Sequence, residues 1–145
     1  MHMPAVGERS FAFNSTRQAS LADDLRIADT HWTRLRGLVG ANASQFVRGQ
    51  GLWIVPCRGV HTLGMGFPID VIYLTADNTV VHLESNLHPW RFAPIRWNAK
   101  TVLEVPADTI RSTGTQLTDC IQIHRASSLR SGRSSEAAEL VKKTS

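Results

Sequence analysis

The clearest structural signal in this chain of 145 residues is the stretch Ile69-Asp70-Val71-Ile72-Tyr73-Leu74-Thr75. Its β-branched and aromatic side chains predict a buried strand, in which Asp70 is the exception. The tripeptide Ala76-Asp77-Asn78 follows and is typical of a hairpin turn. It leads into a second apolar segment, residues 79–85, so the sequence predicts a β-hairpin here.

Short apolar segments on both sides of the hairpin predict a mainly β domain, with α-helix as a minor part. The further expected strands are residues 25–29, 51–55, 101–105 and 120–124, with a weaker one at 11–13. Thr30 is a suitable N-cap for a short helix over residues 30–39. We expect a compact β-sandwich or partly closed barrel of about six to seven short strands with one or two short helices.

The two ends of the chain differ in composition from its middle. Residues 1–20 are mostly polar and are expected to form a poorly ordered N-terminal segment before a domain at 21–125. Residues 126–145 read as a disordered, basic and Ser-rich tail that could hold a short helix. Residues 125–145 have five basic and two acidic side chains, which is +3 of the net charge of +4. The remaining chain is nearly neutral, so nucleic acid is an unlikely partner.

Neither a secretory signal nor a membrane segment is expected. Residues 1–22 contain no apolar core, and no later apolar run approaches the length of a membrane span. Cys57 and Cys120 are too few for a disulfide scaffold, and we expect two unrelated buried thiols. The sequence therefore predicts a cytoplasmic protein with no membrane insertion.

Three blocks of the sequence resemble the DUF192 family, also called UPF0127. The first combines Ala-Asp-Thr at 28–30 with Arg-Leu-Arg-Gly-Leu at 34–38. The second and most specific, within residues 60–74, matches the branch that reads His-Thr-x-Gly-Met-x-Phe-Pro-Ile-Asp. The third comprises residues 102–107 and 117–119. The resemblance implies a compact β fold, and it implies no known reaction, substrate or cofactor.

Asp70 allows two interpretations. A carboxylate in an apolar strand is costly unless it is hydrogen-bonded or paired. It could be a ligand anchor or a general base with a perturbed pKa. It could instead be a structural cap that accepts bonds from the amides of residues 64–67 or pairs with Arg36, and we favour this second interpretation. Glu104 is the one other strand-placed acid that we consider for a paired-carboxylate hydrolase.

Cys57 and His61 could bind a metal or form a nucleophile–base pair. Two ligands are too few for a closed zinc site, although His82, His88 or Cys120 could be recruited. In the other branch of the family that the sequence resembles, an aromatic residue aligns with His61, which argues against an essential base. We therefore expect no cofactor and no metal, with Cys57 and His61 as weak candidates.

The long segment 86–100 alternates aromatic rings with cations. The residues concerned are Trp90, Arg91, Phe92, Arg96, Trp97 and Lys100. Such a pattern suits a groove for single-stranded nucleic acid. It also suits a lid whose rings plug one end of a barrel, or a rim for a small anion with Arg91 and His88 beside Asn86. The nearly neutral body favours the lid.

Taken together, these features predict a binding module with a pocket between the loops 57–70 and 86–97. The candidate ligand-binding residues are His61, Met65, Asp70, Asn86, Trp90 and Arg91. The ligand would be a small molecule or a peptide of a partner protein. One alternative is an enzyme that uses Asp70 or the Cys57/His61 pair, and another is a structural or interaction module without a small-molecule site.

Overall fold

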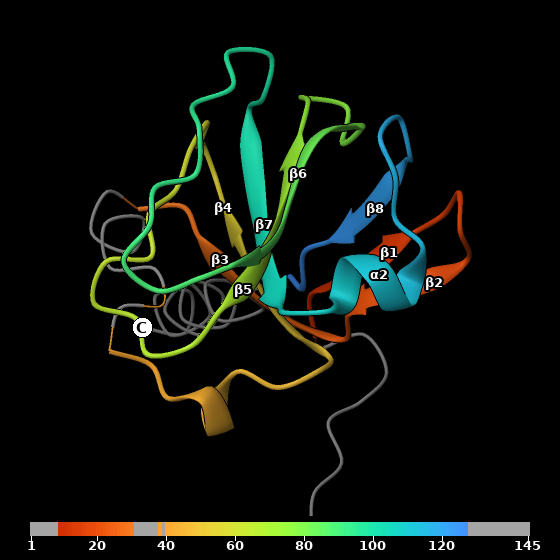
Figure 1. Ribbon diagram of the computed structural model, residues 1–145. Helices are drawn as coiled ribbons and strands as arrows, with labels where there is room; N and C mark the ends of the chain where they lie inside the picture. Colours follow the sequence, from red (N-terminus) through yellow and green to blue (C-terminus); the bar gives the residue numbers. More distant parts are fainter. Residues whose placement is uncertain (1–8, 31–37, 39, 128–145) are drawn as a thin grey trace, which may run out of the picture.

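The computed structural model describes residues 9–30, 38 and 40–127 (Figure 1). Within these residues the chain forms eight strands, one 3-10 turn and one short α-helix. The elements are β1 (Phe11–Asn14), β2 (Ala19–Ala22), β3 (Asp24–Ala28), η1 (Ala43–Gln45), β4 (Gln50–Ile54), β5 (Ile69–Leu74), β6 (Val80–Leu87), β7 (Thr101–Pro106), α2 (Thr109–Thr113) and β8 (Ile121–His124). The predicted mainly β fold is confirmed.

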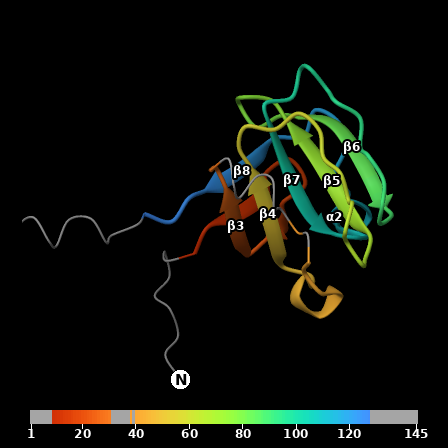
Figure 2. The same ribbon diagram turned by 90° about the vertical axis from the view of Figure 1, so that its left-hand side faces the viewer.

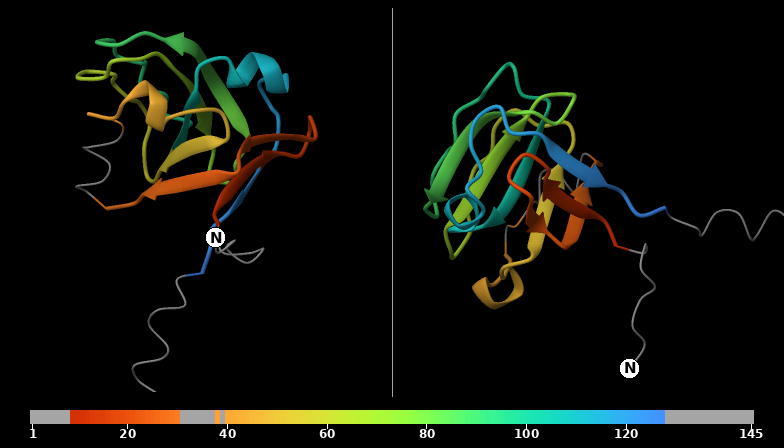
Figure 3. Two further views of the ribbon diagram at one scale, coloured as in Figure 1. Left: turned by 90° about the horizontal axis from the view of Figure 1, so that it is seen from below. Right: turned by 90° about the vertical axis from the view of Figure 1, so that its right-hand side faces the viewer.

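The strands form two sheets that make a sandwich-like fold rather than a closed barrel. The larger sheet has the order β3-β4-β7-β5-β6 and the smaller one the order β2-β1-β8. Figures 2 and 3 show the smaller sheet lying against one side of the larger sheet. Gly51 permits a close approach between them, because a Cβ at this position would lie 2.8 Å from the Cβ of Ala22.

The predicted hairpin is present and lies deep in the larger sheet. All residues of β5 are buried, and β5 pairs antiparallel with both β6 and β7. A strand that has a neighbouring strand on each side and a core on each face is nearly continuously apolar in sequence. This explains why the stretch from Ile69 to Leu74 is the strongest signal in the sequence.

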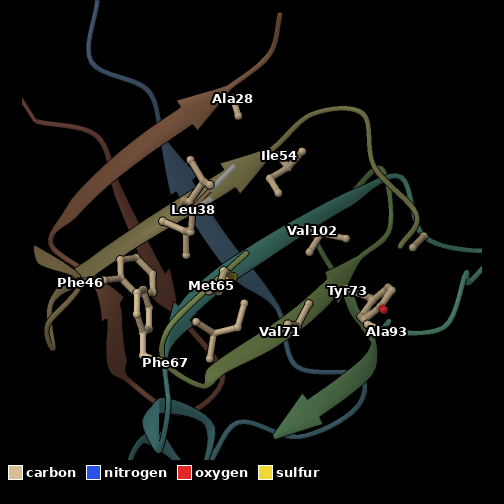
Figure 4. Close-up of a cluster of buried hydrophobic side chains, with 13 residues drawn as sticks. Ala28, Leu38, Phe46, Ile54, Met65, Phe67, Val71, Tyr73, Ala93 and Val102 are labelled. Carbon is tan, nitrogen blue, oxygen red and sulfur yellow. The ribbon is translucent and has the colours of Figure 1, made fainter. Parts of the chain in front are cut away.

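The larger sheet separates two apolar clusters. Val71 and Tyr73 face the first cluster, which Phe46, Met65 and Phe67 cover from outside (Figure 4). Ile72 and Leu74 face the second cluster, which they share with residues of the smaller sheet. Successive side chains of β5 thus pack into different clusters on opposite faces of the sheet, as the pleat of a strand requires.

The fold begins earlier than the boundary at residue 21 that composition suggested. β1 lies between β2 and β8, and Ala12 and Leu21 are buried in the second cluster. Both strands have only four residues, and the edge strand β2 has one large apolar side chain, Leu21, so their periodicity is weak. Residues 1–8 lie outside the described part of the chain.

Most of the expected helix over residues 30–39 lies outside the described residues, as does the expected tail helix. Leu38 is described, and it is buried in the first cluster. In the parts of the chain that the structure describes, helices are too short and too polar to cross a bilayer.

Candidate functional site

The loops 57–70 and 86–97, which the sequence predicted to be the walls of a pocket, are hydrogen-bonded to each other. The amide of Thr62 donates to the carbonyl of Arg91 at 2.8 Å, and the amide of Trp90 donates to the carbonyl of Thr62 at 3.0 Å. Further along, Ala93 donates to Val60 at 2.8 Å. The pattern is an irregular antiparallel ladder, on the left-hand side of Figure 1.

The Thr62 side chain fixes the centre of this ladder. Its fully buried hydroxyl donates to the carbonyl of His88 at 2.6 Å and accepts from the amide of Arg91 at 2.9 Å. One side chain thereby satisfies two backbone groups of the facing loop. Sequence reasoning did not select Thr62, although it stands in the most specific family block.

Two further bonds attach the ladder to β5. The Tyr73 hydroxyl donates to the carbonyl of Pro94 at 2.7 Å, and the amide of Lys100 donates to the carbonyl of Leu74 at 2.8 Å. Burial is the main cause that raises the pKa of Tyr73 above its ordinary value, so the phenol stays a neutral donor. The outer loop therefore has a fixed path over the rigid centre of the sheet.

Asp70 is a structural cap, but its donors are not those that were predicted. The side chain is buried, one oxygen accepts from the amide of Asn86 at 2.8 Å, and the other accepts from the amide of Ile110 at 2.8 Å. The expected donors were the amides of residues 64–67 or Arg36, and Arg36 lies outside the described residues. The carboxylate connects β5 to the end of β6 and to the start of α2.

Asp70 and Glu104 do not form a carboxylate pair. Asp70 lies opposite Val105 in the β5–β7 register, whereas Glu104 lies opposite Val71. Neighbouring register positions direct their side chains to opposite faces of the sheet. The geometry therefore provides no paired-acid site from these two residues.

Glu104 is a buried acid on the face of the first cluster. Burial raises its pKa to about 8, while the charge of Arg26 acts in the opposite direction. Its Oε2 atom has no hydrogen-bond partner within the described residues. At the β3 edge of this face there is an open depression of about 380 Å³. Its lining residues are Asp24, Arg26, Ala41, Gln45 and Gln50.

The cysteines do not match the expectation of two buried thiols. Cys120 is exposed just before β8, Cys57 is half-buried, and no disulfide joins them. The Cys57 thiol donates to the carbonyl of Gly59 at 3.0 Å. Across the described ranges, His, Cys, Asp and Glu side chains form no group of three that could hold a metal ion.

The other candidate residues separate into a surface set and a buried set. Met65 is buried in the first cluster beside Phe67 (Figure 4), so it supports the loop from inside. His61, Trp90 and Arg91 are exposed. Asn86 is also exposed, and its Nδ2 atom lies 3.3 Å from Nε2 of His88. The structure therefore exposes four of the candidates, buries Met65 in the first cluster, and buries Asp70 at the contact between β5, the end of β6 and α2.

The lid prediction is wrong, because the rings point to solvent instead of plugging a barrel. Trp90, Phe92 and Trp97 are 64%, 74% and 75% exposed, and Ile95 is 61% exposed. The small side chain of Ala93 takes the inward position of the ladder. The first cluster includes Ala93 together with Met65, Phe67 and Tyr73, so its buried members come from small or inward-facing residues and not from these rings.

These rings and the adjacent cations form a surface that we call the aromatic–basic face. It comprises Arg58, His61, Trp90, Arg91, Phe92, Ile95, Arg96, Trp97 and Lys100. The guanidinium of Arg58 lies over the Trp97 ring at 5.8 Å, and the His61 and Phe92 ring centroids are 6.3 Å apart. The face thus combines residues of both loops, which neither loop alone could provide.

The two loops that form this face carry positive charges and no negative ones. Residues 55–69 and 86–103 contain four Lys or Arg side chains and no Asp or Glu. The rest of residues 1–124 has seven basic and ten acidic side chains, which is a net charge of −3. The nearly neutral sum over the whole body therefore hides a separation of charge that only the folded arrangement reveals.

Solved structures with the same architecture come from two bacteria. One is a protein of unknown function from Novosphingobium aromaticivorans, with a TM-score of 0.66 and 16% identity over 84% of this chain and 91% of that chain. The other, from Sinorhizobium meliloti, is described as a candidate transcription regulator. It has a TM-score of 0.68 and 18% identity over 85% of this chain and 98% of that chain. At these identities the likeness concerns the fold alone.

Sequence comparison gives the family. A UPF0127 protein of Thermococcus sibiricus is 30% identical over 73% of this chain and 70% of its own length. A UPF0127 protein of Pyrococcus furiosus is 28% identical over 77% of this chain and 97% of its own length. The model of DUF192, described as Uncharacterized ACR, matches residues 12–123. These matches confirm the resemblance seen in the sequence, and the chain belongs to the DUF192 family.

Proposed function

We propose that this chain is a binding protein and that its ligand contacts the aromatic–basic face, formed by the loops 57–70 and 86–97. The observation that carries the proposal is the exposure of Trp90, Phe92 and Trp97, each at 64% or more, on a hydrogen-bonded backbone. Large rings that a fold holds in solvent are typical of interaction sites. The ligand would be a small molecule or a segment of a partner.

The candidate residues take different roles in this proposal. His61, Trp90 and Arg91 would contact the ligand directly, and Asn86 would lie at the rim of the site. Met65 and Asp70 would support the loops from inside, since both are buried. The site is a surface built on paired loops, because the ladder occupies the space in which the sequence predicted a pocket.

The geometry gives less support to an enzyme. Both oxygens of Asp70 already accept backbone amides, so this carboxylate is poorly placed to remove a proton from a substrate. A cytoplasmic location remains part of the proposal.

An amide chemical-shift titration tests this proposal. The isotope-labelled chain would be titrated with a low-molecular-weight fraction of a cell extract that contains metabolites and short peptides. We expect shifts concentrated in residues 57–70 and 86–97, and their loss in Trp90→Ala. Phe11→Ala is the matched control, because Phe11 is an exposed ring on the smaller sheet. Shifts confined to other parts of the fold would contradict the proposal.

A further inference from the structure

We infer that the ligand of the aromatic–basic face is single-stranded nucleic acid. This inference rests on the proposed function and names the chemical class of the partner. It reverses the expectation from composition, which depended on a body that is nearly neutral as a whole. In the structure the rings are exposed, and the cations lie among them.

The first argument is the exposure of the rings. Trp90, Phe92 and Trp97 belong to one loop and are each mostly exposed, and His61 adds a fourth ring 6.3 Å from Phe92. Proteins that bind single strands stack successive bases on such rings, without a requirement for particular bases. A duplex keeps its base faces covered, so it could not use them.

The second argument is charge complementarity. Arg58, Arg91, Arg96 and Lys100 supply four positive charges, and no acid occurs in residues 55–69 or 86–103. A polyanion gains from a surface without carboxylates, because each neutralised phosphate releases bound counterions. The remaining body is net negative, so this face is the part of the fold to which a phosphate backbone would be drawn.

The third argument separates a nucleic acid strand from an anionic membrane. Rings that insert into lipid must project beyond the cations, which stay at the headgroups. Here the guanidinium of Arg58 lies over the Trp97 ring, 5.8 Å from its centroid. A cation at the level of a ring suits a ligand in which phosphates and bases alternate along one chain.

The test is fluorescence anisotropy of labelled single-stranded oligonucleotides of about 12 nucleotides, DNA and RNA, with the full chain. We expect saturable binding that weakens with salt, with a slope of log K against log salt of about −3 if four phosphates are contacted. The double variant Trp90→Ala/Trp97→Ala should bind at least about tenfold more weakly, because it loses two stacking rings but no charge.

Charge variants provide matched controls. Arg96→Gln should reduce the salt slope by about 0.7, whereas Arg48→Gln, at an exposed arginine outside the face, should leave it unchanged. Binding that survives the double tryptophan variant would overturn the inference, since it would come from elsewhere, such as the basic tail. An absence of oligonucleotide binding would overturn it as well.

Two companion measurements separate failure of this inference from failure of the proposed function. Vesicles of anionic phospholipid that bind the chain through Trp90 and Trp97, while oligonucleotides do not, would refute nucleic acid and leave a binding face. Amide shifts on this face with the metabolite and peptide fraction, but none with oligonucleotide, would likewise refute nucleic acid as the ligand and leave the proposed binding face standing. The absence of binding in all three assays would refute both proposals.

Discussion

Replacing Glu104 by glutamine should remove a pH-dependent loss of stability. Burial raises the pKa of Glu104 from 4.5 to about 8 in the folded chain. Between these values the folded state holds a proton that the unfolded state has released, so the free energy of unfolding falls as pH rises. The stabilising contribution is complete below about pH 4.5, and it is lost progressively up to about pH 8.

The difference between the two pKa values sets the magnitude of this effect. Each pH unit in the window corresponds to about 1.4 kcal/mol, which gives a loss of about 3 kcal/mol at pH 7 and about 5 kcal/mol above pH 8. Glutamine is neutral at every pH and has nearly the same shape as the protonated acid. The advantage of Glu104→Gln over the natural chain should therefore grow with pH and then level off.

Urea denaturation of both chains between about pH 5 and pH 9 measures this difference. Titration of all other groups is common to the two chains and cancels in the subtraction. Glu104→Leu also removes the charge. Its difference in free energy of unfolding from the natural chain should grow with pH in the same way, even if a constant amount is added to it at every pH. A difference between Glu104→Gln and the natural chain that stays constant with pH would refute the reasoning.

Other expected outcomes concern the contacts that support the site. Asp70→Asn should lower the free energy of unfolding by about 2–3 kcal/mol, because one of the two amides keeps only a neutral acceptor and the other faces an NH2 group that cannot accept; an unchanged melting temperature would contradict the structural role. Thr62→Val should cost about 1–3 kcal/mol and speed hydrogen exchange at the Arg91 amide, whereas Thr62→Ser should retain most protection. In a thiol alkylation assay Cys120 should react faster than Cys57, and equal rates in the two single Cys→Ser variants would refute the difference in exposure.

The sequence predicted the elements that carry strong patterns. The fully buried run of β5 and the turn before β6 identified the central hairpin, because a strand between two partners needs apolar side chains on both faces. β2 was missed, since an edge strand of four residues with one large apolar side chain has little periodicity. Local pattern thus predicts interior strands more readily than edge strands.

The two candidate loops were selected from the sequence, but the way in which the fold arranges them was not predictable. The family block and the ring-rich loop indicated two segments of the chain, and the structure shows that these segments are hydrogen-bonded to each other. The rings are exposed because a small residue, Ala93, takes the inward position of the loop. An irregular loop has no regular alternation of apolar and polar residues, so the sequence does not show which positions face inward. The buried cap at Asp70 was foreseen, yet its donors at Asn86 and Ile110 come from positions that only the tertiary fold brings near.

The carboxylate of Asp70 also has a consequence for how the domain opens. It bonds to amides 16 and 40 residues further along the chain, one at the end of β6 and one in α2. If either amide were released to solvent, one oxygen of the buried Asp70 carboxylate would lose its hydrogen-bond donor. Separate fraying of the end of β6 or of α2 is therefore costly. The hairpin end and the short helix should therefore behave as one cooperative unit, with the Asn86 and Ile110 amides exchanging hydrogen at similar free energies of opening.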